Sequence, residues 1–184
     1  LYEIRGNNDK ALKEIDLMLE IATSANLSSY KRLGFLDRGA MYAAAGSFDK
    51  ALEDAIELKK RIDEGMNKKE IRYYYYLMGA IELRRENFAE SIEHIQRGLS
   101  MESYGDLGKP ARSLETLALA YYRSRELNKA LVEYERITQL TNTRRGFGDI
   151  YAKAFYMLGK IHEEQGDTQE AIENYEKFLD LWKD

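Results

Sequence analysis

The sequence predicts an all-α fold, a solenoid of antiparallel helix pairs, and three observations carry this prediction. A short phrase recurs along the chain at intervals of about 40 residues, which is typical of proteins that stack similar helical units. The 184 residues include a single proline, and proline costs ~3 kcal/mol inside a helix, so the composition favours long helices. Charged residues make up 33% of the chain, which suits the solvent-facing sides of amphipathic helices.

The recurring phrase opens with a turn and continues into a helix. Its five versions are GNNDKALKEI, GSFDKALEDA, ENFAESIEHI, RELNKALVEY and GDTQEAIENY. Each version has a small residue at the same place, namely Ala11, Ala51, Ser91, Ala130 and Ala171. A second small residue precedes it in every complete copy, at Gly39, Gly79, Ala118 and Gly159. Because glycine costs about 1 kcal/mol in a helix, its recurrence indicates that two backbones approach closely there.

The units follow one another as a single predicted array over residues 1–184. The first unit retains little of its first helix, and each later unit holds a first helix, a turn and a second helix. The expected bounds are 1–27 for the partial unit, then 28–67, 68–106, 107–146 and 147–184. The chain opens with LYEIRGNND and no methionine, so we interpret it as a fragment of a longer protein.

Local signals mark where the helices begin and end. Gly166 is a good helix terminator, and Asp167 with Glu170 predicts a capping box at the start of the next helix. Asn87 and Glu90 repeat that pair two units earlier. Pro110 is expected in the first turn of a helix, where its missing N–H group does no harm.

The paired helices, the small residue in each and the turn between them resemble the tetratricopeptide repeat family. The resemblance covers nearly the whole chain and is strongest in the last unit, AFYMLGKIHEEQGDTQEAIENYEKFLDLW. The usual period of that family is ~34 residues, so this chain is similar to its longer-helix variants. The resemblance implies a right-handed superhelix whose first helices line a concave groove and whose second helices form the outer surface. HEAT and armadillo arrays are the alternative at this period, but they lack the recurring G-(D/N/S)-x-x-x-A turn.

The run IRYYYYLMG, residues 71–79, places four tyrosines on consecutive positions of one first helix. Successive helical residues point ~100° apart, so the four rings must divide between different faces. The stripe expected to face the companion helix is Tyr75, Gly79 and Glu82. The stripe expected to pack against the preceding unit is Tyr74, Met78 and Ile81. The remaining side, which the resemblance places in the groove, holds Tyr73, Tyr76, Ala80, Leu83 and Arg84.

The same register predicts the groove face of the other units. In the second unit it gives Leu36, Ala40, Ala43 and Ala44, a smooth apolar stretch. In the fourth unit it gives Arg112, Glu115, Leu119, Tyr122 and Arg123. In the last unit it gives Lys153, Tyr156, Lys160, Glu163 and Glu164. Tyrosine and arginine are typical of binding hot spots, so this face is the predicted partner-binding site. The alternative is that Tyr73 and Tyr76 only cover neighbouring units.

Catalytic, metal and cofactor sites are not expected. The chain has no cysteine, which excludes disulfides and thiolate chemistry. Its two histidines, His94 and His162, fall in different units, and His162 lies on a packing face. The glycine-lysine pair in GDLGKPARS lacks the spacing of a phosphate-binding loop, and NTRRGFGD at 142–149 is interpreted as a linker. No group of residues supplies a nucleophile, a base and an orienting group, so we expect a non-catalytic protein.

We therefore predict a protein-interaction scaffold that binds a peptide or partner segment in the groove. The expected partner carries an apolar anchor and one or more acidic groups. A formal charge of −4 and the lack of a long apolar run predict neither nucleic-acid nor membrane binding, and we expect a cytoplasmic location. Two alternatives stay open: a regulatory module of a larger bacterial signalling protein, such as a kinase, cyclase or transcription regulator, and a self-assembly module that forms homo-oligomers.

Overall fold

A computed structural model describes residues 5–101, 110–140 and 143–183. The described residues form helices and contain no β-strand, which confirms the all-α prediction. The chain divides into two compact units, Leu1–Met101 and Glu102–Asp184, and each is described by itself. From here on, the first and second unit are these two parts of the chain, each of which contains more than one sequence repeat.

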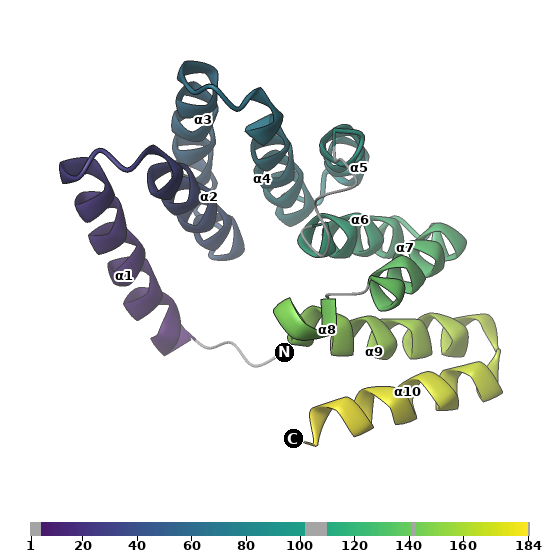
Figure 1. Ribbon diagram of the computed structural model, residues 1–184. Helices are drawn as coiled ribbons and strands as arrows, with labels where there is room; N and C mark the ends of the chain where they lie inside the picture. The colour runs from purple at the N-terminus through teal and green to yellow at the C-terminus, as the bar shows by residue number, and fades with distance from the viewer. Residues whose placement is uncertain (1–4, 102–109, 141–142, 184) are drawn as a thin grey trace. The chain divides into compact units, whose positions relative to one another are not determined.

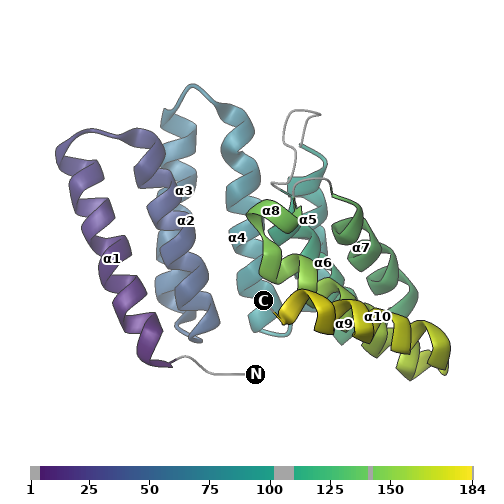
Figure 2. The same ribbon diagram turned by 60° about the horizontal axis from the view of Figure 1, so that its bottom comes forward.

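The first unit holds five α-helices and one short 3₁₀ helix. They are α1 (Arg5–Ser24), α2 (Ser28–Ala44), α3 (Phe48–Glu64), η1 (Lys68–Glu70), α4 (Ile71–Arg84) and α5 (Phe88–Leu99). Helix α2 pairs with α3, and α4 pairs with α5, each pair running antiparallel (Figure 1). Helix α1 lies at the edge of the unit and packs against α2 (Figure 2).

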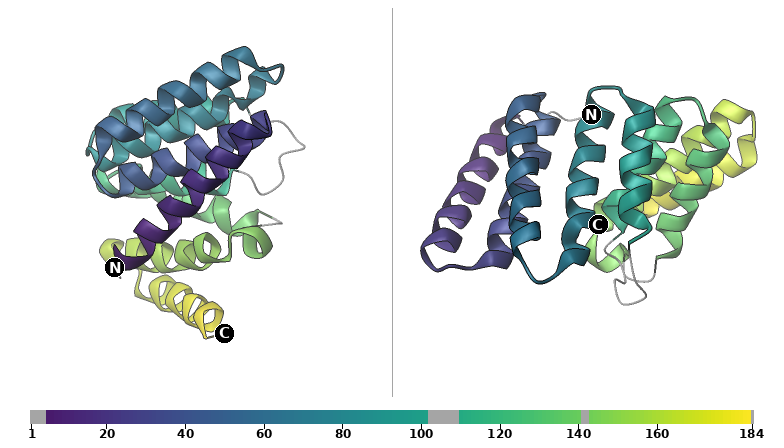
Figure 3. Two further views of the ribbon diagram at one scale, coloured as in Figure 1. Left: turned by 90° about the vertical axis from the view of Figure 1, so that its left-hand side faces the viewer. Right: turned by 90° about the horizontal axis from the view of Figure 1, so that it is seen from above.

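The second unit repeats the arrangement with two further pairs. Its helices are α6 (Ala111–Arg123), α7 (Leu127–Gln139), α8 (Thr143–Gly146), α9 (Gly148–Gln165) and α10 (Thr168–Trp182). Helix α6 pairs with α7, α9 pairs with α10, and α7 contacts α9, so the second pair stacks on the first. Figure 3 shows the pairs of both units from two further directions. This stacking of antiparallel pairs is the predicted fold class.

Apolar side chains from neighbouring helices form the interior of each unit. In the first unit, Leu58 of α3 and Leu77 and Ile81 of α4 are fully buried. In the second unit, Tyr134 and Ile137 of α7 are equally buried. Each such side chain contributes about 1.5–3 kcal/mol on leaving water, so burial between pairs is the main stabilising term.

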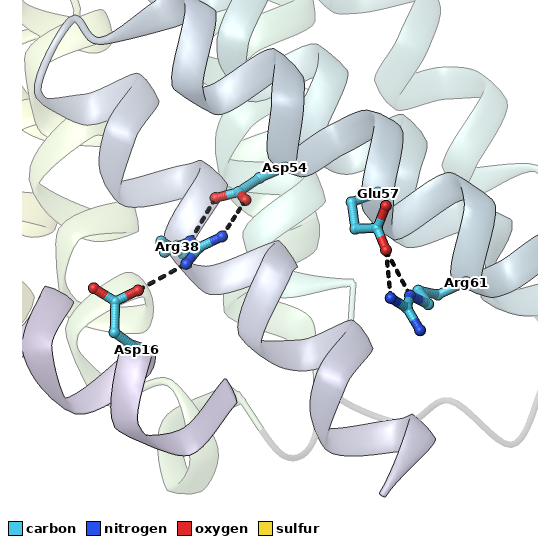
Figure 4. Close-up of polar contacts among 5 residues, drawn as sticks. All are labelled: Asp16, Arg38, Asp54, Glu57 and Arg61. Atoms are coloured by element: carbon cyan, nitrogen blue, oxygen red, sulfur yellow. Dashed lines mark hydrogen bonds and ion pairs between the residues drawn. The ribbon is translucent and has the colours of Figure 1, made fainter. Parts of the chain in front are cut away.

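One ion-pair network crosses the interior of the first unit. Arg38 of α2 donates from Nε and Nη2 to both carboxylate oxygens of Asp54 on α3, at 3.0 and 2.7 Å (Figure 4). Its Nη1 atom donates to Asp16 of α1 at 2.7 Å. Hydrogen bonding to Asp54 raises the pKa of Arg38, and this outweighs the opposite effect of its burial. Asp54 is only 4% exposed, so Arg38 supplies the counter-charge that a buried carboxylate needs.

The turn inside each helix pair is built in the same way. One residue in the left-handed region follows the first helix, at Gly46, Glu86, Arg125 and Gly166. At Glu86, φ is 65°; its N–H donates to Leu83 O at 3.2 Å, and the N–H of Asn87 donates to Glu82 O at 2.9 Å. These two bonds define a Schellman motif, which satisfies the last carbonyls of a helix. Two of the four positions are not glycine, although left-handed backbone costs other residues about 1–2 kcal/mol.

We expect Glu86→Gly to raise the free energy of unfolding by about 0.5–1 kcal/mol. Glycine relieves the left-handed strain, although it also adds some freedom to the unfolded chain. Urea unfolding followed by the helical circular-dichroism signal measures the change. Gly166→Ala is the matched control at an equivalent turn with φ of 86°, and it should lower stability by about 1 kcal/mol. Shifts of the same sign in both variants would contradict this account of the turns.

The predicted capping boxes are wrong. Neither Asn87 nor Asp167 makes a side-chain hydrogen bond to the start of its helix. The Asn87 amide instead donates to Glu82 Oε2 at 2.7 Å, and Asp167 lies 3.5 Å from His162 Nδ1. Both side chains reach back to the preceding helix because the tight turn brings its end within range. Gly166 is confirmed as a terminator. Pro110 directly precedes α6 as its N-cap residue, one position before the first turn in which it was expected.

Two further segments differ from the sequence prediction. The phrase GNND, which marks a turn elsewhere, lies inside α1, because in the described residues no helix precedes α1 for such a turn to close. The linker at 142–149 is partly helical, since it contains α8 and the first residues of α9. Residues 102–109, with the glycine-lysine pair at 108–109, lie outside the described residues.

Candidate partner-binding face

Two tyrosines of the run, Tyr75 and Tyr74, make the packing contacts that the helical register predicts for them. Tyr75 faces the companion helix α5, where its ring stacks on His94 at 6.3 Å between centroids. The guanidinium carbon of Arg97, also on α5, lies 4.8 Å from the centre of the Tyr75 ring. Tyr74 packs against the core that α2 and α3 contribute to, and it lines a surface hollow with Ile56 of α3. Both of these tyrosines are therefore structural.

The other side of α4 carries the first part of the predicted face. Tyr73 and Tyr76 are half-buried and pack against the same core, so each ring is shared between packing and exposed surface. Ala80 is half-buried and Arg84 is exposed. Leu83 is only 5% exposed, so it adds almost no surface to this face. On α2, Leu36 and Ala43 are also buried, because they belong to the core rather than to an open apolar stretch.

In the second unit, the predicted faces of α6 and α9 adjoin one another. Lys153 Nζ of α9 lies 2.5 Å from Glu115 Oε1 of α6. The Tyr122 hydroxyl of α6 donates to Glu164 of α9, and Lys160 Nζ lies 5.3 Å from the centre of the Tyr122 ring. The register thus brings residues 38 and 42 positions apart in the sequence into contact.

The remaining predicted residues of α6 and α9 are exposed or half-buried. Arg123 is exposed, and Leu119 is half-buried between Glu115 and Tyr122 in the register. Arg112 is exposed, and its guanidinium carbon lies 5.8 Å from the centre of the Phe147 ring. Tyr156 is 42% exposed, and its ring packs 5.4 Å from that of Phe178 on α10. Tyr156 is therefore the most accessible of the four predicted tyrosines.

Burial and hydrogen bonds keep two tyrosine hydroxyl groups of the second unit protonated. Burial and the hydrogen bond to Glu164 both raise the pKa of Tyr122, so its hydroxyl remains a donor. Burial and a 2.7 Å hydrogen bond to Glu163 raise the pKa of Tyr175 to about 12. Arg125, which the sequence analysis missed, lies 2.9 Å from Glu164. Nothing in the sequence pattern signals this pair, because Arg125 belongs to a turn rather than to a helical stripe.

The two histidines that the sequence analysis considered make contacts within the fold. His94 stacks on Tyr75, and His162 is half-buried beside Asp167. Among the described residues, no cluster of three or more His, Asp or Glu side chains could hold a metal ion. None of the helices described has both the length and the apolar character that a membrane span requires.

The face therefore belongs to stacked helix pairs with a small residue at each crossing. Residues 111–184 match the family model described as tetratricopeptide repeat. These residues belong to the tetratricopeptide repeat family. The resemblance inferred from the repeats is thereby confirmed, and the HEAT and armadillo alternative is set aside. The period of about 40 residues continues through the first unit, where the turns at Gly46 and Glu86 have the same left-handed residue and hydrogen bonds as those of the matched residues.

Solved structures share this tetratricopeptide-type fold over nearly the whole chain. A crystal structure of MamA is 21% identical with a TM-score of 0.59, covering 96% of this chain and 90% of that one. The MamA RS-1 ArsTM double mutant is 18% identical with a TM-score of 0.58, covering 96% and 86%. BtubC (BKLC) from P. vanneervenii is 16% identical with a TM-score of 0.68, covering 97% and 72%. At such identities the likeness shows the fold alone. Among proteins with curated descriptions, none matches the sequence.

Proposed function

We propose that this chain is a non-catalytic scaffold that binds a peptide or a segment of a partner protein through its first helices. The observation that carries the proposal is the continuous face that α6 and α9 form with their predicted residues. Tyr122 contacts Glu164, Lys153 contacts Glu115, and the half-exposed ring of Tyr156 lies on the same side of α9. Tyrosines beside cations are the usual composition of a binding hot spot.

Basic side chains outnumber acidic ones on this face, which favours a partner with acidic groups. The basic residues are Arg112, Arg123, Arg125, Lys153 and Lys160, and the acidic residues are Glu115, Glu163 and Glu164. Two of these cations already have an internal counter-charge, since Lys153 pairs with Glu115 and Arg125 with Glu164. An acidic partner must therefore displace these carboxylates, and we infer moderate affinity that weakens as salt screens the charges.

We expect Tyr76→Ala combined with Tyr122→Ala to weaken partner binding at least about tenfold, because truncating a tyrosine hot spot costs ~2 kcal/mol. Partners are captured from lysate of the source organism, and the affinity of each purified partner is then measured by calorimetry. The variant must first show the helical content of the wild type.

Ile56→Ala with Val132→Ala provides the control, since these side chains are 67% and 53% exposed on second helices, away from the face. Unchanged affinity in the tyrosine variant, or an equal loss in the control, would contradict the assignment of the face. Capture of the chain alone would instead favour self-association, for which Leu179 and Trp182 of α10 offer exposed apolar surface.

A further inference from the structure

The carboxylate of Glu164 in α9 is held by two side chains that lie outside its own helix pair. Its Oε1 atom accepts a hydrogen bond from the Tyr122 hydroxyl of α6, and its Oε2 atom lies 2.9 Å from Arg125 Nη1 in the turn after α6. Lys160, one turn before Glu164, has its Nζ atom 5.3 Å from the centre of the Tyr122 ring. Hydroxyl, guanidinium and ammonium groups are the usual donors to a carboxylate. Tyr122, Arg125 and Lys160 therefore form an anion site, and the chain's own carboxylate fills it.

The donors of this site are positioned by contacts that do not involve the carboxylate. The Tyr122 side chain is half-buried. The N–H groups of Arg125 and of the next residue donate to carbonyls at the end of α6, at 3.1 and 2.8 Å, and these bonds fix the backbone of the turn. Arg125 has a φ of 67°, a left-handed conformation in which two equivalent turns have Gly46 and Gly166. Glycine would fit this backbone without strain, so the arginine brings its side chain to the site at a cost in backbone energy.

The end of α9 is an unfavourable place for a carboxylate. Glu164 lies in the last turn of α9, where the free carbonyl groups carry partial negative charge, and Glu163 directly before it has the same charge. At the equivalent place, α4 and α6 have Arg84 and Arg123, which a helix C-terminus favours. The stability of α9 therefore does not explain why this residue is acidic.

The stacking of helix pairs does not require the contact either. Between α2 and α4, the places of Tyr122 and Glu164 are taken by Ala43 and Arg84, and Ala43 belongs to the apolar core. The Arg125 side chain is 75% exposed and that of Glu164 is 29% exposed, and ion pairs of this kind contribute little to stability. Another anion can therefore displace this carboxylate at little cost to the fold.

We propose that Glu164 is an internal competitor for the acidic group of the partner. It occupies the anion site of Tyr122, Arg125 and Lys160, which receives an aspartate or glutamate side chain of the bound segment. This inference rests on the proposed function, because Tyr122 and Lys160 belong to the proposed partner-binding face. A segment without an acidic side chain gains nothing from displacing Glu164, since it cannot replace the negative charge. Glu164 thus weakens binding and favours partners that carry an acidic group.

The probe is hexaglutamate, acetylated at one end and amidated at the other, so that its only carboxylates are on side chains. Binding to the isotope-labelled protein in about 0.1 M salt is followed by NMR, from the shifts of the backbone amides of residues 122–126 and 160–166. Glu164→Gln should bind this peptide about fivefold more tightly than the wild type does, because the neutral amide no longer competes for the cations. This gain corresponds to about 1 kcal/mol, the upper value for an exposed ion pair. Hexaglutamine blocked in the same way should bind to neither protein.

Glu133→Gln is the matched control for the change in net charge. Glu133 lies in α7 and pairs with Arg136 at 2.6 Å, so this variant also loses one negative charge and one ion pair with arginine in the second unit. It should leave the affinity for hexaglutamate within about twofold of the wild type, because salt screens charges that lie outside the site. An equal gain in Glu133→Gln would show that Glu164 acts only through net charge, and it would overturn the proposal.

Arg125→Gly removes one donor without harming the fold, since glycine suits the left-handed backbone of this turn. It should weaken hexaglutamate binding at least about fivefold, because the guanidinium is lost from the site. When Arg125→Gly is already present, the gain from Glu164→Gln should fall to less than about twofold, since the two residues act on one another. A gain that persists in full, with an unchanged circular-dichroism spectrum, would mean that Glu164 does not compete for this site.

Further outcomes separate this inference from the proposed function. If neither the wild type nor Glu164→Gln binds hexaglutamate, the anion site is wrong. If hexaglutamine with a free C-terminus binds and blocked hexaglutamate does not, the site takes a terminal carboxylate and the side-chain assignment is wrong. If the captured partner is lost in Tyr76→Ala with Tyr122→Ala but gains nothing in Glu164→Gln, the proposed function stands and the competitor is overturned. If that partner is unaffected by the tyrosine variant while hexaglutamate behaves as expected, the proposed function fails and the anion site with its competitor is supported.

Discussion

Arg38→Met is expected to lower the free energy of unfolding of the first unit by about 3 kcal/mol, because it leaves a buried carboxylate without its counter-charge. Asp54 is 4% exposed, and its two oxygens accept hydrogen bonds from Arg38 at 3.0 and 2.7 Å (Figure 4). Removing one partner of a buried pair typically costs 3–5 kcal/mol. The lower end applies here, since the Arg38 side chain is itself 22% exposed and water can partly replace it.

The two carboxylates bound to Arg38 should differ widely in their effect. Asp16 is 53% exposed on α1, and an exposed ion pair contributes about 0–1 kcal/mol, so Asp16→Ala should change stability little. Arg38→Met with Asp54→Leu should recover most of the loss, because an apolar pair of similar volume can replace a buried ion pair. Urea unfolding of the four proteins, followed by circular dichroism, provides the comparison. A double variant no more stable than Arg38→Met would contradict the explanation by unpaired charge.

Sequence reasoning succeeded where one helix contains the whole pattern. The stripe of Tyr75, Gly79 and Glu82 follows from helical geometry, and the structure places Tyr75 and Gly79 against α5. Glu82 is buried at 8% and accepts a hydrogen bond from Asn87, the residue directly before that companion helix. The 3.6-residue period fixes such stripes without any knowledge of the neighbours.

Sequence reasoning failed where a contact depends on the register between two helices. The sequence analysis singled out neither Arg38 nor Asp54, because their meeting requires the exact offset of α2 against α3. The Lys153–Glu115 pair depends in the same way on the offset of α9 against α6. The turns at Glu86 and Arg125 were predicted, but their left-handed conformation was not, since neither residue is glycine and only the backbone bonds reveal it.

The exposed fraction of each side chain also could not be predicted from its position on a helical face. Leu36 and Leu83 share the register of the predicted partner-binding face, yet both are 5% exposed. The alanines of the same register differ among themselves, since Ala43 is 2% exposed whereas Ala40 and Ala80 are half-buried. Conversely, Ile172 and Leu179 are apolar residues of α10 but are 47% and 54% exposed. Whether an apolar stripe is covered depends on a neighbouring helix, which the stripe itself does not encode.

We expect Gly79→Ala to lower the free energy of unfolding by about 1–2 kcal/mol, although alanine is the better helix former. The propensity gain is about 1 kcal/mol, and inserting a methyl group into a packed interior costs ~1–3 kcal/mol. The new Cβ would lie 2.5 and 2.6 Å from two side-chain carbons of Ile95 and 3.2 Å from the backbone oxygen of Ser91. Ile95 is fully buried and branched, so it has little room to move.

The clash with Ile95 can be separated from a general effect of the substitution on the helix. Gly148→Ala at the start of α9 adds a Cβ with nothing within 4 Å, so it should raise stability by up to about 1 kcal/mol. Ile95→Val shortens the clashing side chain, and adding it to Gly79→Ala should cost less than the two single losses combined. Ser91 Oγ donates to Gly79 O at 2.8 Å across the same crossing, so amide exchange in α4 should also quicken in Gly79→Ala. Additive losses, with slow exchange retained, would mean that the two backbones are not held together at Gly79. The small residue that recurs in every complete unit would then have no packing role at this crossing.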